Sequence, residues 1–81
     1  MNPARLDFPV LTWLQLRAQP GENGPWFTAR DVANAQDIIA AYDGLAATRL
    51  RRVQESLARM AAAGFITVKR RGRLVKYRVD Y

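Results

Sequence analysis

The apolar and polar positions along the chain predict three helices followed by two strands. The first helix is expected at residues 8–18, with Asp7 as its N-cap and Pro9 in its first turn. Pro20-Gly21 is expected to end it. Its apolar residues cover more than one stripe of the helix surface, so Leu16, with Trp13 as a second candidate, is expected to face away from the domain core. These apolar residues are Phe8, Val10, Leu11, Trp13, Leu14 and Leu16.

A second helix is predicted at residues 29–42. Thr28 and Asp31 have the spacing of a capping box, in which two side chains and two backbone amides bond reciprocally at a helix N-terminus. Apolar side chains then recur at i, i+3, i+7 and i+10, which is the spacing of one helical face. Gly44 is expected to end the helix in the left-handed conformation, with Leu45 packing back. Just before the helix, Trp26-Phe27 is suited to a strand of two or three residues.

A third helix is predicted at residues 48–63, with Thr48 as its N-cap and Gly64 as the glycine that ends it. One face is apolar at the same helical spacing, and the opposite face carries charged residues. The apolar face consists of Leu50, Val53, Leu57, Met60 and Ala61.

After Gly64 the apolar pattern changes from helical spacing to alternation, which predicts a β-hairpin with strands 65–69 and 74–79. Arg71-Gly72 is expected to be the two-residue turn, because glycine supplies the positive φ that such turns require. This turn would pair Arg70 with Arg73 and Val68 with Val75. The outer face of the hairpin would then carry Thr67, Lys69, Lys76 and Arg78.

Positive charge is concentrated in the C-terminal half of the chain. Residues 1–43 carry three basic and five acidic side chains, a net charge of −2, whereas residues 44–81 carry ten basic and two acidic ones, a net charge of +8. The net charge of the whole chain is +6. A uniformly solvated surface gives no reason for such segregation, whereas a surface that binds nucleic acid does.

The segment LRRVQESLARMAAAGFI resembles the recognition helix and first wing strand of the winged helix-turn-helix family of DNA-binding proteins. In that family, apolar residues stand eleven, seven and four positions before a glycine that an apolar pair follows. Val53, Leu57 and Met60 occupy these positions before Gly64, and Phe65-Ile66 follows. VKRRGRLVKYRV is similar to the family's basic wing.

The length of 81 residues predicts a single domain over residues 1–81. The resemblance implies an α+β fold for it, with a three-helix core followed by a C-terminal β-hairpin wing. Its function would be that of a small transcriptional regulator that binds specific sequences of double-stranded DNA. One feature departs from the family pattern. The twelve residues ANAQDIIAAYDG and a following LAAT separate the second and third helices, where many family members have a tight turn.

The expected DNA-binding surface combines the third helix with the hairpin. An α-helix fits the major groove of B-DNA, where arginine can pair bidentately with guanine or grip phosphates. Gln54 is a weaker candidate for an adenine contact, because it is expected nearer the buried side. The wing tip can reach the phosphate backbone or the minor groove. The residues expected to bind DNA are Thr48, Arg49, Arg51, Arg52, Arg59, Lys69, Arg70, Arg71, Arg73, Lys76 and Arg78.

Partners and alternatives follow from the same patterns. The small core and the apolar surface of helix 8–18 predict a homodimer formed through that helix. Two alternative functions remain open at this point: a winged-helix module that binds an acidic protein, and binding of structured RNA, although the aromatic signature of the RNA recognition motif is absent. Duplex DNA is favoured over a protein partner, because charged residues are depleted at the centres of protein interfaces.

Composition argues against several other classes. The chain has no cysteine and no histidine, so we expect neither a disulfide, nor a zinc finger, nor catalysis by either residue. We therefore expect no enzyme, no cofactor, no metal and no small-molecule effector. No apolar run approaches the roughly 20 residues of a membrane span. The expected location is the cytoplasm, in association with the nucleoid if the protein is prokaryotic and binds DNA.

Overall fold

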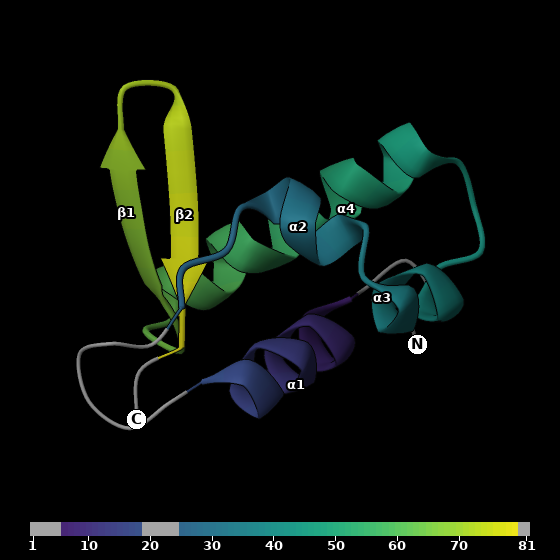
Figure 1. Ribbon diagram of the computed structural model, residues 1–81, viewed down its shortest axis with the longest axis horizontal. Coiled ribbons are helices and arrows are strands. Elements are labelled where there is room, and N and C mark those ends of the chain that lie inside the picture. The colour runs from purple at the N-terminus through teal and green to yellow at the C-terminus, as the bar shows by residue number, and fades with distance from the viewer. Residues whose placement is uncertain (1–5, 19–24, 80–81) are drawn as a thin grey trace.

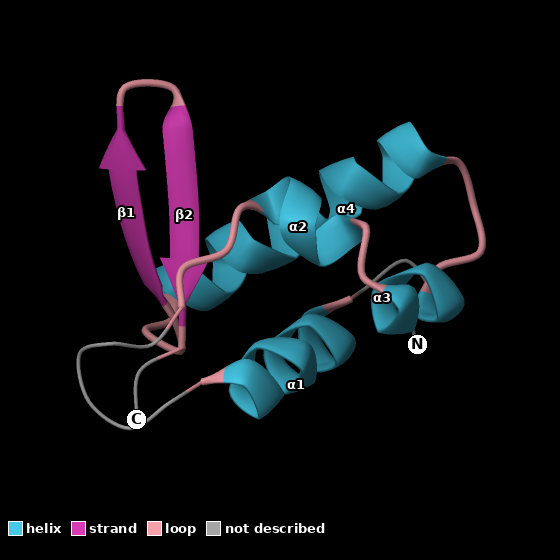
Figure 2. Cartoon of the chain, viewed as in Figure 1, coloured by secondary structure: helices cyan, strands magenta, loops and turns pink. Residues whose placement is uncertain are grey.

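The chain forms an α+β structure with helices packed beside one antiparallel hairpin (Figures 1 and 2). The computed structural model describes residues 6–18 and 25–79. Within these ranges none of the helices combines the length and hydropathy needed to cross a membrane. The elements are α1 (Asp7–Arg17), α2 (Ala29–Ala33), α3 (Gln36–Ala41), α4 (Ala46–Ala62), β1 (Thr67–Arg71) and β2 (Leu74–Arg78).

Helix α1 packs one side against the core and leaves the other exposed. Val10, Trp13 and Leu14 are buried at helical spacing, whereas Phe8 and Leu16 are 69% and 73% exposed. The exposure of Leu16 confirms the prediction, but Trp13 belongs to the core.

The N-terminus of α1 differs from the expectation. Leu6 occupies the N-cap position and makes no side-chain cap bond, so the prediction of Asp7 as the N-cap is wrong. Asp7 is the first helical residue instead, and its carboxylate binds Arg59 of α4. Pro20-Gly21 lies outside the described residues.

The predicted helix at residues 29–42 is two helices. The capping box is confirmed: the Asp31 amide donates to Thr28 Oγ1 over 3.1 Å, and the Thr28 amide donates to the Asp31 carboxylate over 3.0 Å. The chain leaves the helical conformation at Ala35, where ψ is 140°. The break changes the phase of the helix, so that Ile38 is fully buried. Ile39, which the unbroken pattern placed on the apolar face, is 41% exposed.

The connection from α3 to α4 also differs from the expectation. Among the described residues only Gly64 and Gly72 have positive φ, so Gly44 is not a left-handed stop. Gly44 instead allows a close approach, because a Cβ there would lie 2.5 Å from Cε1 of Tyr42. Leu45 is 77% exposed and does not pack back.

Helix α4 is the central element of the core. It begins at Ala46 with Leu45 at the N-cap, so the prediction of Thr48 as the N-cap is wrong. Val53, Leu57 and Met60 are buried as predicted, and Leu50 is half-buried. Gly64 follows the helix with φ of 86°, which confirms the predicted glycine stop.

The hairpin pairs its strands in a register two residues away from the prediction. Val68 lies opposite Tyr77, and Arg70 opposite Val75, so the turn is centred on Gly72-Arg73. A turn centred on Arg71-Gly72 in the common form with two positive φ angles would force Arg71 into the left-handed region, whereas Gly72 adopts its φ of 60° without strain. A shift of two residues leaves every side chain on its predicted face, because strand side chains alternate with a period of two.

Phe27 joins the hairpin and ties it to the helices. The Phe27 amide donates to the Tyr77 carbonyl over 2.9 Å, and the Tyr77 amide donates to the Phe27 carbonyl over 2.7 Å. The short strand predicted at Trp26-Phe27 is therefore a single bridged residue, Phe27. The Phe27 ring meets Trp13 of α1 edge-on, with centroids 4.8 Å apart. The hairpin is thereby fixed to the helical core at its base, and its tip projects beyond the helices (Figure 1).

Candidate nucleic-acid interface

An open groove of about 620 Å³ lies between the hairpin and the helices. Three arginines contribute to its walls: Arg30 from α2, Arg70 from β1 and Arg73 from the turn. No acidic side chain lines the groove in the described parts of the chain. The full lining is Thr28, Ala29, Arg30, Leu50, Gln54, Ala58, Arg70, Arg73, Leu74, Val75 and Tyr77.

Local structure explains how these side chains converge. The capping box fixes the start of α2, and Arg30, the second residue of that helix, is exposed beside it. Leu50, Gln54 and Ala58 lie one above another on α4, since residues four apart share a helix face. Arg70 lies on the same hairpin face as its partner Val75, and this face turns toward the groove.

The groove continues toward the N-terminus of α4. A second hollow of about 360 Å³ shares Arg30 and Leu50 with the groove and extends to Ala46 and Ala47. The exposed Arg51 stands four residues after Ala47 and three before Gln54, so it is a neighbour of both on the helix surface. Gln54 lines the groove, and Arg51 lies next to it on the exposed surface of α4.

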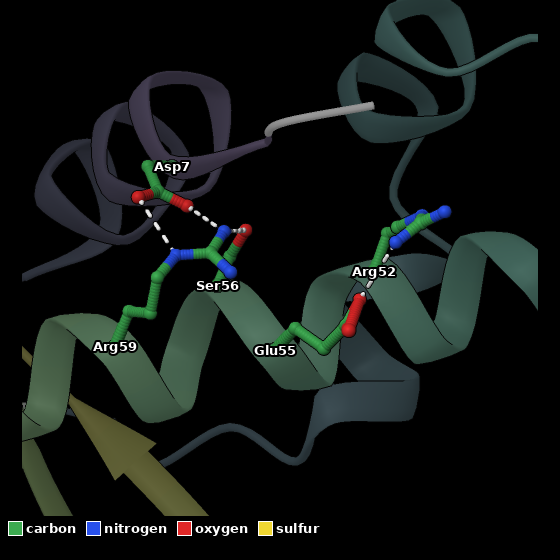
Figure 3. A network of polar contacts seen from close by, with 5 residues as sticks. All are labelled: Asp7, Arg52, Glu55, Ser56 and Arg59. Carbon is green, nitrogen blue, oxygen red and sulfur yellow. Dashed lines mark hydrogen bonds and ion pairs between the residues drawn. The ribbon is translucent and has the colours of Figure 1, made fainter. Parts of the chain in front are cut away.

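Two other arginines of α4 extend from the opposite side of the helix (Figure 3). Arg59 holds Asp7 of α1 through Nη2–Oδ1 and Nε–Oδ2 contacts of 2.6 and 3.3 Å, and its Nη2 also donates to Ser56 Oγ over 3.1 Å. The hydrogen bond to Asp7 raises the pKa of Arg59 above its ordinary value. The Arg59 guanidinium is thus engaged by a carboxylate of the same chain.

Arg52 lies on this second side as well. Arg52 Nη1 is 3.1 Å from Oε1 of Glu55, and the Arg52 Nε is buried with no hydrogen-bond partner in the described structure. Arg52 and Gln54 are two positions apart, which places them about 200° apart around a helix. The structure therefore does not bring Arg52 and Arg59 together with the groove arginines.

Arg49 is held inside the protein. It is only 9% exposed, and its Nε donates to the carbonyl oxygen of Ala33, the last residue of α2, over 2.9 Å. In an uninterrupted helix this carbonyl would accept from the amide four residues later. Arg49 thus satisfies the backbone at the break between α2 and α3.

The outer face of the hairpin presents a second group of cations. In the strand register, Lys69 lies opposite Lys76, and Thr67 lies opposite Arg78, which confirms that these four residues share the outer face as predicted. Arg71 and Leu74, which also lie opposite each other, belong to the same face. The Trp26 ring covers part of it, 4.6 Å from the Arg78 guanidinium carbon and 5.5 Å from Lys69 Nζ.

The structure divides the eleven predicted residues into separate groups. Arg70 and Arg73 line the groove, while Thr48, half-buried, and the exposed Arg51 lie on the N-terminal half of α4. The cations of the outer hairpin face point away from the groove, and the remaining three arginines bind groups of their own chain.

Sequence reasoning missed two residues, Arg30 and Trp26. Strand alternation carried a signal for Trp26: when Phe27 faces the core, the preceding residue faces the opposite side of the sheet. Arg30 follows the capping box by two residues, but only the fold brings the start of α2 beside the hairpin.

Comparisons of the chain with protein-family models, with curated proteins and with solved structures found no match.

Proposed function

We propose that the protein is a winged helix-turn-helix protein that binds specific sequences of duplex DNA, as a transcriptional regulator does. The observation that carries the proposal is the groove in which Arg30, Arg70 and Arg73 meet beside Gln54, with no acidic residue among its described walls. These arginines are separated by up to 43 positions in the sequence, and the fold places them on one surface.

Each part of the surface has its own role in this proposal. The exposed side of α4 near Arg51 and Gln54 enters the major groove, where their side chains can bond to guanine and adenine edges. Arg30, Arg70 and Arg73 hold the flanking phosphates, which gives affinity without sequence preference. The uniform sign of the charge in the groove favours a nucleic acid over an acidic protein, whose interface would have fewer charges at its centre.

Binding of labelled duplexes at several salt concentrations tests the proposal. Arg73→Ala should weaken binding to all duplexes alike and reduce the salt slope by about 0.9, as expected for the loss of one phosphate contact. Gln54→Ala should weaken the preferred sequence by about 1–3 kcal/mol relative to other duplexes, after that sequence has been selected from a random pool.

Arg52→Ala is the matched control, because it removes the same charge from the other side of α4. We expect it to leave affinity and salt slope nearly unchanged. A loss equal to that of Arg73→Ala would contradict the assignment of the groove. Absence of duplex binding at low salt would contradict the proposed function itself.

A second part of the proposal is a homodimer formed through α1. Phe8 and Leu16 leave much of their apolar surface exposed on that helix, and a second copy would bury it. A dimer would set two α4 helices against two half-sites about one turn of DNA apart. Sedimentation at micromolar concentration should show a dimer, and Leu16→Asp should make it a monomer. A monomeric wild-type protein would rule out this assembly.

A further inference from the structure

We infer that the outer face of the hairpin is a second binding site, which takes an unpaired base of single-stranded DNA on Trp26 and the flanking phosphates on the surrounding cations. A hollow of about 130 Å³ on this face supports the inference. Trp26 and Leu74 form its apolar walls, and Lys69, Arg71 and Lys76 surround them.

The volume of the hollow suits one planar ring. A cavity of about 150 Å³ is known to hold a benzene ring in an apolar protein core. Trp26 is half-buried and lines the hollow, and a base that stacks on its ring would replace a cation, since Lys69 and Arg78 lie over the ring. Stacking of a base on an aromatic side chain tolerates any base, because each has a π face, and it contributes substantially to affinity for single strands.

The charges of this face also fit a nucleic-acid strand. Lys69 and Arg71 alternate along β1 with Arg70, which faces the groove, so the hairpin itself separates the two sets of cations. No carboxylate lines the hollow in the described ranges. A duplex seated in the groove would therefore leave the outer cations without a phosphate partner.

A single strand fits the hollow better than a duplex, because the bases of a duplex have no free face. Bases of a duplex are stacked on one another, so their faces are closed to Trp26, whereas an unpaired base can leave the strand and stack on a side chain. We assign the strand to DNA, a choice that rests on the proposed function of the groove, since an opened duplex there would supply unpaired bases close by.

Fluorescence anisotropy of the intact chain with an oligothymidine of about ten nucleotides tests this site. Trp26→Leu should weaken binding by about tenfold, within the range measured for loss of one stacking side chain. Trp26→Phe should retain most of the affinity, because it keeps an aromatic face. An abasic oligonucleotide with the same number of phosphates should bind more weakly, and equally to all three proteins.

A second measurement does not depend on the fold of the Trp26 variants. The chain has two tryptophans, so Trp13→Phe leaves Trp26 as the only indole. Oligothymidine should quench its emission, and the abasic strand should not.

The possible outcomes separate this inference from the proposed function. Equal binding of oligothymidine and the abasic strand, or no quenching, would overturn the stacking site while duplex binding in the groove could still stand. If the protein does not bind duplex DNA but still binds oligothymidine in a way that depends on Trp26, the proposed function of the groove is wrong and the stacking site stands. Binding of an oligouridine RNA of the same length, without binding of the DNA, would overturn the assignment to DNA.

Discussion

The two sides of α4 differ both in the residues they carry and in their surroundings. On one side, Arg52 and Arg59 pair with Glu55 and Asp7, so each positive charge has a negative partner. On the other side, α4 contributes Gln54 to a groove whose charged walls are arginines of α2 and the hairpin. The number of arginines on a helix therefore says little about where it binds an anion, whereas the charges that other elements bring to each side say a great deal.

The difference arises from the packing of the helices around α4. Helix α1 packs against α4 and places Asp7 within hydrogen-bond distance of Arg59. The hairpin flanks the other side and brings Arg70 and Arg73. Both arrangements depend on the apolar face of α4, which positions the two sides relative to each other.

The largest effect is expected for the core residue beneath both sides, Leu57. Its side chain is fully buried, so Leu57→Ala should lower the free energy of unfolding by about 2–5 kcal/mol. Urea unfolding followed by circular dichroism measures this change. Leu45→Ala is the control, because Leu45 is 77% exposed and its truncation should change stability by no more than about 0.5 kcal/mol. Similar losses for both variants would contradict the central position of α4.

Sequence patterns were sufficient for the features of this fold that depend on local spacing. The capping box at Thr28 and Asp31, the buried face of α4 around Leu57, the glycine stop and the alternation of the hairpin all depend on residues a few positions apart. The side chains on each face of the hairpin were predicted correctly although the predicted register was wrong by two residues, because a shift of two leaves each side chain on the same face.

The features that sequence patterns missed depend on contacts between distant segments. The helix breaks at Ala35, and the side chain of Arg49 donates a hydrogen bond to the carbonyl oxygen of Ala33 beside the break. Arg49 and Ala33 are sixteen positions apart in the sequence. The pairing of Arg59 with Asp7 spans 52 positions, and the groove joins α2 to the hairpin. An exposed arginine and one engaged by its own chain look the same in a helical pattern, so charge alone could not separate the candidate site from the structural arginines.

A smaller effect than that of Leu57 is expected for Arg49. Arg49→Met keeps the aliphatic stem but removes the donor to the Ala33 carbonyl, so we expect a loss of about 1.5–3 kcal/mol in unfolding free energy. Arg51→Met is the matched control two positions along the helix, where the exposed side chain should contribute little to stability. The order should reverse in duplex binding, with Arg51→Met the weaker binder. If both variants unfold at the same urea concentration, Arg49 has no structural role of this kind.

The smallest effect is expected for Asp7→Asn, which removes the carboxylate charge but retains the shape of the side chain. Arg59 and Asp7 are well exposed, with side chains 42% and 34% accessible, and exposed ion pairs contribute about 0–1 kcal/mol. The thermal unfolding midpoint should therefore fall only slightly. Duplex affinity is the more informative measurement, because the substitution adds one unit of net positive charge beside α4. If this side of α4 faces away from DNA, affinity and salt slope should stay close to those of the wild type. A tighter complex with a salt slope steeper by about 0.9 would instead place Arg59 at a phosphate, and the distinction between the two sides of α4 would then be wrong.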